Sequence, residues 1–387
     1  MRRGATGKHE TTIVAGETVR AFIPHPLPPE PALALSNRCQ RLLERATVAL
    51  GRLDSVTLLL PDPNIFLYAY VRREAVLSSQ IEGTQSSLEQ LLLFEMEEAP
   101  GVPIDDVREV SNYVAALNYG LKRLQEDFPL SNRLIREMHG ILLSQGRGSN
   151  KSPGEFRRSQ NWIGGTRPGN AHFVPPPPGQ VEPCMAQLER FLHDADNSYP
   201  ILINAALAHV QFETIHPFLD GNGRIGRLLI AFILHHDRLL SQPLLYLSLY
   251  FKQHRSEYYR LLDLVRTEGD WEAWLDFFLE GVEQIASSAV ETAKRLLSLF
   301  QQDERKIQTL GRSASITMRV FRVLCEHPLT TLNRICKLTG ISFPASSKGM
   351  QQLETLDIVR EITGQQRNRI FAYQQYLSIL NEGTETS

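Results

Sequence analysis

The feature that most restricts the fold is a helical spacing of apolar residues, which runs through most of the chain. Such spacing places apolar side chains on one face of an α-helix, where another element has to cover them. We therefore predict a mainly α-helical protein. The spacing is found in residues 36–50, 63–83, 86–96, 104–125, 131–145, 180–195, 199–215, 223–237, 248–267, 270–299 and 315–327.

Composition and charge restrict the class of protein. The chain has 387 residues, with 42% hydrophobic residues, 22% charged residues and a net charge of −2. This balance is ordinary for a globular protein, and any nucleic-acid site would have to be local. The four cysteines have no CxxC spacing, so we expect reduced thiols and no zinc site. The first ten residues lack the apolar core of a secretory signal, which predicts a cytoplasmic protein with no membrane contact.

Two segments depart from the helical pattern. Residues 1–35 are rich in proline and glycine, and we predict an irregular arm on the surface. Residues 150–179 place a Gly-rich turn between FRRSQNWI and AHFV, which predicts a β-hairpin followed by a polyproline tether. In this segment Arg157, Arg158 and Trp162 are candidates for substrate contact, and solvation or packing explains them equally well.

The last 75 residues have a pattern of their own. A short helix, a turn through Thr339 and Gly340, and a second helix near 344–356 precede two β runs, IVREI and RIFAY. This order is typical of a small winged-helix domain. Its basic content is modest, so DNA binding, protein docking and dimer formation all stay open. The side chains expected on the recognition helix are Ser346, Ser347, Lys348 and Gln351.

The segment HPFLDGNGRIGR, residues 216–227, collects groups that bind phosphate. Gly221 and Gly223 let the backbone approach a ligand closely, and a helix follows at once. The first N–H groups of a helix form an anion site, where the helix dipole also favours negative charge. Arg224 and Arg227, three residues apart, lie on one face of that helix. Two guanidinium groups beside free N–H groups suit a polyphosphate.

The same segment also contains a base and a metal ligand. Asp220 supplies an oxygen of the kind that Mg²⁺ uses together with substrate phosphates. His216 titrates near neutral pH and is able to remove a proton from a hydroxyl. A phosphate site, a metal and a base are the parts of phosphoryl or nucleotidyl transfer.

This segment resembles the HxFx[D/E]GNGRxxR signature of Fic (Fido) domain proteins, which are mostly protein adenylyltransferases (AMPylases). The resemblance implies a transferase that moves AMP from ATP to a Ser, Thr or Tyr hydroxyl of a target protein or of itself. It implies His216 as the general base and Asp220 as the ligand of Mg²⁺. An aromatic side chain near the adenine is implied on the helix that holds Tyr258 and Tyr259, and a core role is equally expected for each. The implied ATP-binding residues are Gly221, Asn222, Gly223, Arg224, Ile225, Gly226, Arg227, Tyr258 and Tyr259.

Family members often carry an inhibitory helix with the pattern [S/T]xxxE[G/N]. Residues 78–83, SSQIEG, fit this pattern with Ser78, Glu82 and Gly83, and Gly83 is also an ordinary helix C-terminal residue. The pattern recurs at residues 378–383, SILNEG. We prefer Glu82 over Glu382 because it precedes the catalytic segment. The hypothesis is autoinhibition in which Glu82 pairs with Arg227.

The resemblance also implies an organisation and a set of partners. Residues 1–125 would form the arm and a helical region with the inhibitory helix at about 65–83. Residues 126–300 would form the Fic core with a target-docking flap at 155–174, and residues 308–387 the winged-helix domain. A homodimer is implied as well. The alternative activities are de-adenylylation, a different phosphate donor, or, in another class, a DNA-binding regulator with a nucleotide-sensing core.

Overall fold

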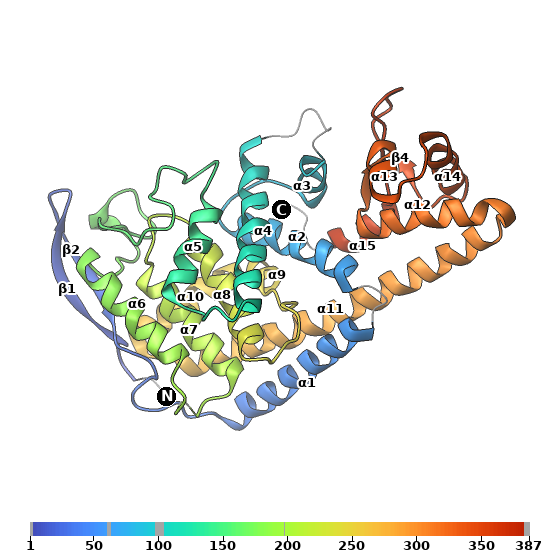
Figure 1. The fold of residues 1–387 in the computed structure, drawn as a ribbon. Helices are drawn as coiled ribbons and strands as arrows, with labels where there is room; N and C mark the ends of the chain where they lie inside the picture. Colours follow the sequence, from blue (N-terminus) through green and yellow to red (C-terminus); the bar gives the residue numbers. More distant parts are fainter. Residues whose placement is uncertain (1–2, 60–62, 97–103, 197, 383–387) are drawn as a thin grey trace.

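A computed structural model describes residues 3–59, 63–96, 104–196 and 198–382, and the fold is mainly α-helical as predicted (Figure 1). Each helical interval of the sequence contains a helix, although residues 248–267 form two. The helices are α1 (Asn37–Leu59), α2 (Pro63–Ile81), α3 (Leu88–Phe94), α4 (Ile104–Gln125), α5 (Asn132–Leu142), α6 (Pro178–Leu192), α7 (Ile201–Ile215), α8 (Asn222–His236), α9 (Ser248–Gln253), α10 (Arg255–Glu268), α11 (Trp271–Gln308), α12 (Ala314–Glu326), α13 (Leu332–Thr339), α14 (Phe343–Thr355) and α15 (Gln374–Asn381).

The core is built around α7 and α8. Both helices are apolar on nearly every face, and almost all of their side chains are buried, as expected of central helices. They pack against each other, and α4, α5, α6 and α10 surround them. The turn between α7 and α8 holds residues 216–221, so the predicted catalytic segment lies between the two most central helices.

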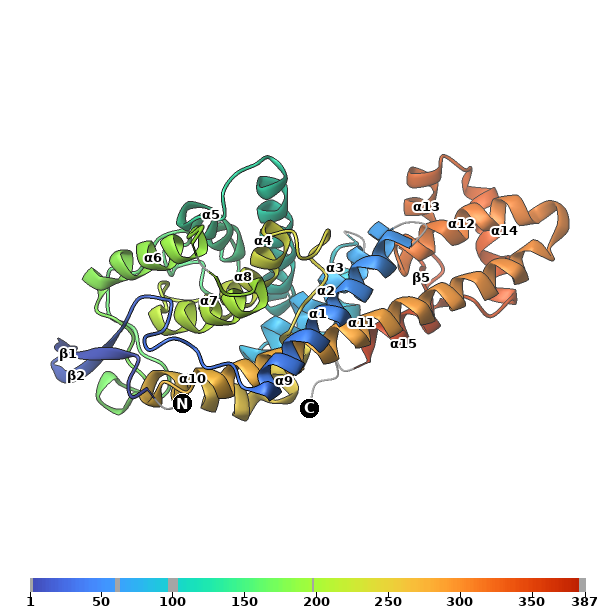
Figure 2. The same cartoon turned by 90° about the horizontal axis from the view of Figure 1, so that it is seen from below.

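A second layer joins the core to the C-terminal part of the chain. Helices α1 and α11 run side by side along the core, and α11 continues beyond it to the C-terminal helices (Figure 2). The apolar stripe of α11 is buried along most of its length. Within the described residues, no helix combines the length and the apolar content needed to cross a membrane.

The N-terminal segment corrects the prediction of an irregular arm. Strands β1 (Gly7–Val14) and β2 (Glu17–Pro24) form an antiparallel hairpin, joined by Ala15 and Gly16, which both have positive φ. The alternation of burial along β2 places Val19 and Ala21 against Val174. The prolines follow the hairpin, at the point where a strand has to end.

The flap segment also differs from its prediction. In residues 155–174 the pairing is limited to one antiparallel bridge between Ile163 and Phe173, with a short 3₁₀ helix at Pro168–Asn170. Gly164 and Gly165 both take positive φ, so the backbone turns too sharply for a longer ladder. The main chain of Phe22 on β2 donates to the Val174 carbonyl, so the β1–β2 hairpin supports this segment instead.

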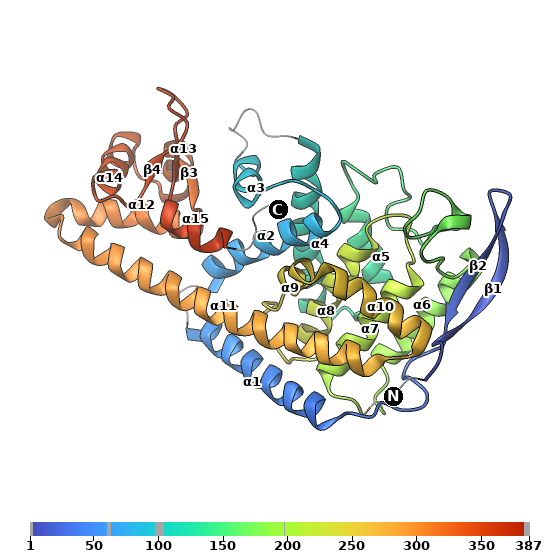
Figure 3. The same ribbon diagram turned by 180° about the vertical axis from the view of Figure 1, so that it is seen from behind.

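The C-terminal part has the order of elements that the sequence indicates (Figure 3). Strands β3 (Leu329–Thr331), β4 (Arg360–Glu361) and β5 (Ile370–Ala372) form an antiparallel sheet in the order β3-β5-β4, beside α12, α13 and α14. Its assignment as a winged helix stays a prediction. One detail is corrected, because Ser346 is fully buried beside Cys336 and does not reach the surface.

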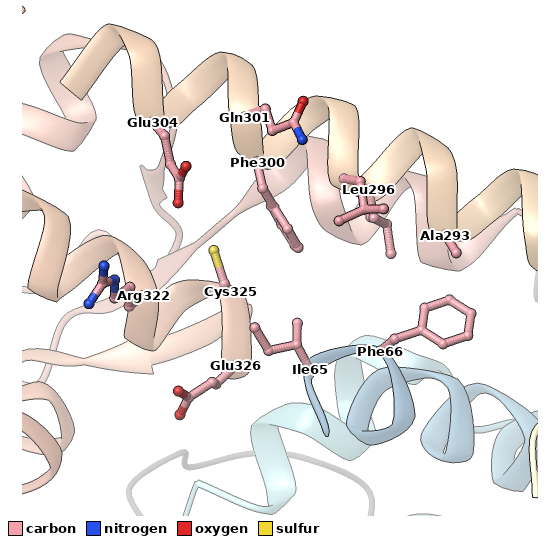
Figure 4. Close-up of a pocket in the computed structure, with 11 residues that line it drawn as sticks. Ile65, Phe66, Ala293, Leu296, Phe300, Gln301, Glu304, Arg322, Cys325 and Glu326 are labelled. Carbon is pink, nitrogen blue, oxygen red and sulfur yellow. The ribbon is translucent and has the colours of Figure 1, made fainter. Parts of the chain in front are cut away.

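Helix α2 connects this C-terminal part to the core. The Tyr376 hydroxyl of α15 donates to the Ile65 carbonyl, and Arg73 donates to the Glu382 carbonyl. A pocket of about 390 Å³ lies between α2, α11 and α12, with Ile65, Phe66 and Phe300 on its apolar side (Figure 4). The helix that leads to Glu82 is thus held by both parts of the protein.

Candidate active site

His216 terminates α7 in an unusual backbone conformation. Its φ and ψ are 49° and 60°, in the left-handed region that residues other than glycine rarely adopt. Its N–H donates to the Phe212 carbonyl at 2.9 Å, and its own carbonyl accepts from Arg157 Nε at 2.9 Å. The turn therefore leaves the helix abruptly, and its direction is fixed by hydrogen bonds on both sides of the histidine.

The loop after His216 is closed by buried polar groups. The Asn222 side chain accepts from the Phe218 N–H at 2.8 Å and donates to the Phe218 carbonyl at 2.9 Å. The Asp220 carbonyl lies 3.0 Å from Nε2 of His139, whose Nδ1 accepts from the Gly154 N–H at 2.9 Å. Nε2 is therefore the protonated nitrogen, and burial lowers the pKa of His139 to about 4, so the ring stays neutral. These bonds hold the loop rigidly against α5.

The N-terminus of α8 forms an anion site. Gly221 has a φ of 76° and precedes the helix, whose first intrahelical bond runs from the Ile225 N–H to the Gly221 carbonyl. We define the anion site as the N–H groups of residues 222–224, which lie before that bond. The Glu82 carboxylate is packed against Gly223 so closely that a Cβ at that position would collide with it.

Arg227 is held by Ser78 of α2 and by Glu82, which directly follows α2. Its Nη2 donates to Glu82 Oε1 at 2.8 Å and to the Ser78 carbonyl at 2.9 Å, and its Nε donates to Ser78 Oγ at 2.8 Å. The Arg227 side chain is buried, whereas 34% of the Glu82 side chain is exposed. Burial raises the pKa of Glu82, but Arg227 outweighs this effect and keeps that pKa below its ordinary value. The predicted pairing of Glu82 with Arg227 is therefore present in the structure.

The second copy of the inhibitory pattern lies elsewhere. Gly83 has a φ of 98° and ends the turn after α2, as its position predicts. The Glu382 carboxylate instead pairs with Arg295 of α11 at 2.6 Å, on the surface. The structure thus brings Glu82, and not Glu382, to the anion site.

Arg224 does not share a target with Arg227. Its Nη1 lies 2.5 Å from Oε1 of Glu109 on α4, and both side chains are almost completely buried. Its Nη2 lies 3.5 Å from Oδ1 of Asp220. In this structure the two arginines therefore bind different carboxylates, and their joint binding of phosphates stays a prediction. Glu109 was not predicted as a site residue, because no motif surrounds it.

Asp220 fits a magnesium ion that is shared with phosphates. Its side chain is 28% exposed, and Oδ1 accepts from the Gly221 N–H at 2.6 Å, beside the anion site. No group of three metal-ligating side chains occurs in the described residues. A single carboxylate beside a phosphate site is the protein's usual contribution to bound Mg²⁺, because phosphates and water complete the shell.

The electrostatics of the site keep His216 neutral. Burial lowers the pKa of His216 to about 4, and the charges of Arg157 and Arg266 act in the same direction. The Glu82 carboxylate raises this pKa but does not offset them. A neutral imidazole is the form that accepts a proton, so His216 is a competent base at neutral pH.

Two family models match the parts of the chain that contribute residues to this site. Residues 40–122 match the Fic/DOC family N-terminal domain, and residues 129–234 match the Fic/DOC family domain. The chain thus carries both domains of the Fic/DOC family. The first of these matches contains Glu82 and Glu109, and the second contains His139 and the whole of residues 216–227.

Similar sequences carry the name Protein adenylyltransferase Fic. Those from Drosophila ananassae and Drosophila melanogaster are 33% identical over 207 residues, which is 53% of this chain. The aligned segment spans only 38% and 39% of the length of these relatives. The similarity therefore concerns the Fic segment, which is less than half of each relative.

Solved structures agree on the fold. A Fic family protein from Desulfovibrio desulfuricans G20 has a TM-score of 0.58 at 21% identity, covering 89% of this chain and 98% of that chain. A Fic domain containing signaling protein from Bacteroides thetaiotaomicron has a TM-score of 0.51 at 21% identity, covering 67% of this chain and 97% of that chain.

Some residues of the Fic motif serve packing. The Ile225 side chain is in the hydrophobic core, and Gly226 packs so tightly against α7 that a Cβ would lie 2.5 Å from Oε1 of Glu213. We therefore assign the side of the helix formed by these two residues to the α7–α8 contact, and a contact with ATP through their main chain stays a prediction.

The two tyrosines of α10 differ in their exposure to solvent. Tyr258 is 1% exposed, and its hydroxyl lies 2.9 Å from Nε2 of the buried His209, which makes it the core residue. Its assignment as an ATP contact is corrected for that reason. Tyr259 is 40% exposed and is close enough to Glu82 and Arg227 for their charges to affect its pKa, which burial raises. Tyr259 thus keeps the role of a candidate adenine contact.

Proposed function

We propose that this Fic protein transfers AMP from ATP to a Ser, Thr or Tyr hydroxyl of a target protein or of itself, and that Glu82 restrains this activity. The names of the Drosophila relatives support the choice of AMP as the transferred group. The geometry of residues 216–227 supports the roles of the individual side chains.

The chemistry divides between three parts of the loop. His216 takes the proton of the target hydroxyl, whose oxygen attacks the α-phosphorus. The bond from that phosphorus to the oxygen bridging to the β-phosphate breaks, and pyrophosphate leaves. Asp220 would hold Mg²⁺, which neutralises phosphate charge when bound. The anion site holds phosphate oxygens with preorganised N–H groups, which need no reorganisation during the reaction.

One observation carries this proposal: the Glu82 carboxylate lies against Gly223 and binds Arg227. A carboxylate carried by another helix already occupies an anion's place at the N-terminus of α8. Since N–H groups and a guanidinium both favour negative charge, the same place suits a phosphate of ATP once Glu82 leaves it.

This arrangement also explains how the restraint would act. Arg227 has its Nε and Nη2 occupied by Ser78 and Glu82, so these donors are unavailable to a phosphate. ATP would then be held by fewer groups, and its α-phosphorus would not lie in line with the hydroxyl oxygen. Small misplacements of this kind are costly to rate.

The test uses ATP labelled in two positions. The Glu82→Gly variant is incubated with α-labelled ATP or with γ-labelled ATP, alone and with cell extract, and His216→Ala in the same background is the control. AMP transfer predicts label on protein from α-labelled ATP only, lost in the control. Label from the γ position would instead indicate phosphate transfer, and label from neither would exclude ATP as the donor. Mass spectrometry of the labelled band identifies the target residue.

A further inference from the structure

Arg157 lies buried beneath the turn that carries His216. Its Nε donates to the His216 carbonyl at 2.9 Å, and its Nη2 donates to the Pro176 carbonyl at 2.6 Å and to the Ile215 carbonyl at 3.4 Å. Its main-chain N–H donates to the Pro217 carbonyl at 2.9 Å. One residue thus binds three consecutive carbonyls, on both sides of the peptide bond that follows His216.

The chemistry of these partners is unusual for a buried arginine. Only 2% of Arg157 is exposed, and within the described residues the acceptors bonded to its guanidinium are neutral carbonyl oxygens. A buried guanidinium without a carboxylate partner costs free energy, and burial accordingly lowers its pKa to about 10. The guanidinium reaches the carbonyls of Ile215, His216 and Pro176 at once, which the planar fork of donors of arginine allows and a lysine ammonium does not reproduce.

The turn itself needs support. A left-handed conformation at a residue other than glycine costs on the order of 1–3 kcal/mol and persists only where the surroundings fix it. In this loop the Arg157 guanidinium binds the carbonyls of Ile215 and His216, and the Arg157 main-chain N–H binds that of Pro217.

We infer that Arg157 is a positioning residue, which holds His216 in its left-handed conformation and so aims the imidazole at the reacting hydroxyl. The guanidinium acts from below the loop and touches no substrate. This inference deepens the proposed function and rests on it for the reaction that His216 performs.

The charge of Arg157 has a second effect on the same histidine. Among the described residues, the charged groups that act on the His216 imidazole are Arg157, Arg266 of α10 and Glu82, which directly follows α2. After burial, the two arginines are the causes that lower its pKa, and Glu82 opposes them. A neutral side chain at position 157 should therefore raise the pKa of His216. A lysine there keeps the positive charge and should leave this pKa unchanged.

Two variants separate shape from charge. Arg157→Lys keeps the positive charge but loses the fork of donors, and Arg157→Met loses both. Arg45→Met on α1 is the matched control, because the Arg45 side chain is 62% exposed, pairs with Glu283 and lies outside the flap and the loop after α7. All are made in the Glu82→Gly background, and thermal unfolding and circular dichroism check that each variant folds.

The first measurement is AMP transfer from ATP. We expect the rate constant to fall by about 100-fold in both Arg157 variants, with little change in the KM for ATP, because the base is misplaced and the phosphate site is intact. Arg45→Met should match its parent. A rate in Arg157→Lys equal to the parent would overturn the positioning role.

The second measurement needs no turnover. In protein with ¹³C-labelled histidine, the His216 signals are assigned by their loss in His216→Ala. We expect Arg157→Met, but not Arg157→Lys, to raise the His216 titration midpoint by about one pH unit. The His216 Cα shift should lose its left-handed signature in both variants. Unchanged shifts and midpoints would overturn the inference, even where the parent transfers no AMP and the proposed function itself fails.

Discussion

Nη1 of Arg224 and Oε1 of Glu109 form a buried ion pair, 2.5 Å apart, between the Fic motif and the N-terminal helical region. Asp220 Oδ1 lies on the other side of the same guanidinium, at 3.5 Å. The pair therefore links α4 to the loop that would hold magnesium. Glu109 is the carboxylate partner of Arg224, and Glu82 is that of Arg227. The Glu109–Arg224 pair is the more deeply buried of the two.

Replacing Glu109 should destabilise the fold. Glu109→Gln leaves the Arg224 charge buried without its partner, and we expect the free energy of unfolding to fall by about 3–5 kcal/mol. Urea unfolding followed by circular dichroism measures the change. The control is Glu257→Gln, which breaks an exposed pair with Arg260 and should cost less than about 1 kcal/mol. Equal losses in the two variants would contradict the assignment.

AMP transfer should persist to a lower pH than it would if the pKa of His216 had the ordinary histidine value. Because burial and nearby arginines lower the pKa of His216 to about 4, the base form persists above that pH and is lost as the pH falls through it. In Glu82→Gly the opposing carboxylate is gone, so the pKa should be lower still. We expect a rate of AMP transfer that is flat between about pH 8 and pH 5. A loss of activity centred near 6.5, the ordinary histidine value, would refute this point.

Gly226 should be needed for packing. In Gly226→Ala, the new Cβ would lie 2.5 Å from Oε1 of Glu213 and 3.2 Å from the Phe212 ring. We expect a loss of about 1–3 kcal/mol in the free energy of unfolding, because the core cannot yield without strain. Gly51→Ala is the contrast, since an added Cβ there meets no atom within 4 Å, and it should stabilise helix α1 by about 0.5–1 kcal/mol. The urea midpoints of the two variants should move in opposite directions.

Tyr259 should contribute to binding of the adenine base. Stacking on an aromatic side chain is worth about 1–3 kcal/mol per base, so Tyr259→Ala should weaken ATP binding by about tenfold or more, and Tyr259→Phe should not. Calorimetry in the Glu82→Gly background measures both. Inorganic triphosphate, which has no base, should bind all three proteins equally. If triphosphate binding weakens as well, the tyrosine acts on the phosphates or on folding.

The helices and the catalytic loop could be predicted because their signals are local. The spacing of apolar residues indicated α7 and α8, and residues 216–227 are contiguous. The pairing of Glu82 with Arg227 came from the family resemblance, since 145 residues separate them. Glu109 and Arg157 were missed as partners of the motif, because each acts through tertiary contacts that leave no periodicity.

The β elements show the same limit. The β1–β2 hairpin was missed because β1 is largely exposed, the alternation of β2 is short, and prolines follow it closely. The flap was predicted as a hairpin from the residues beside Gly164 and Gly165, yet the backbone there pairs at Ile163 and Phe173 only. A turn signal indicates where a chain reverses but does not fix how far the pairing extends.

The central claim is that Glu82 restrains AMP transfer by holding Arg227. The direct measurement is the initial rate of label incorporation from α-labelled ATP, compared between the wild-type protein and Glu82→Gly. The account predicts a large increase in Glu82→Gly, abolished by adding His216→Ala. Equal rates in the wild-type protein and Glu82→Gly would contradict it.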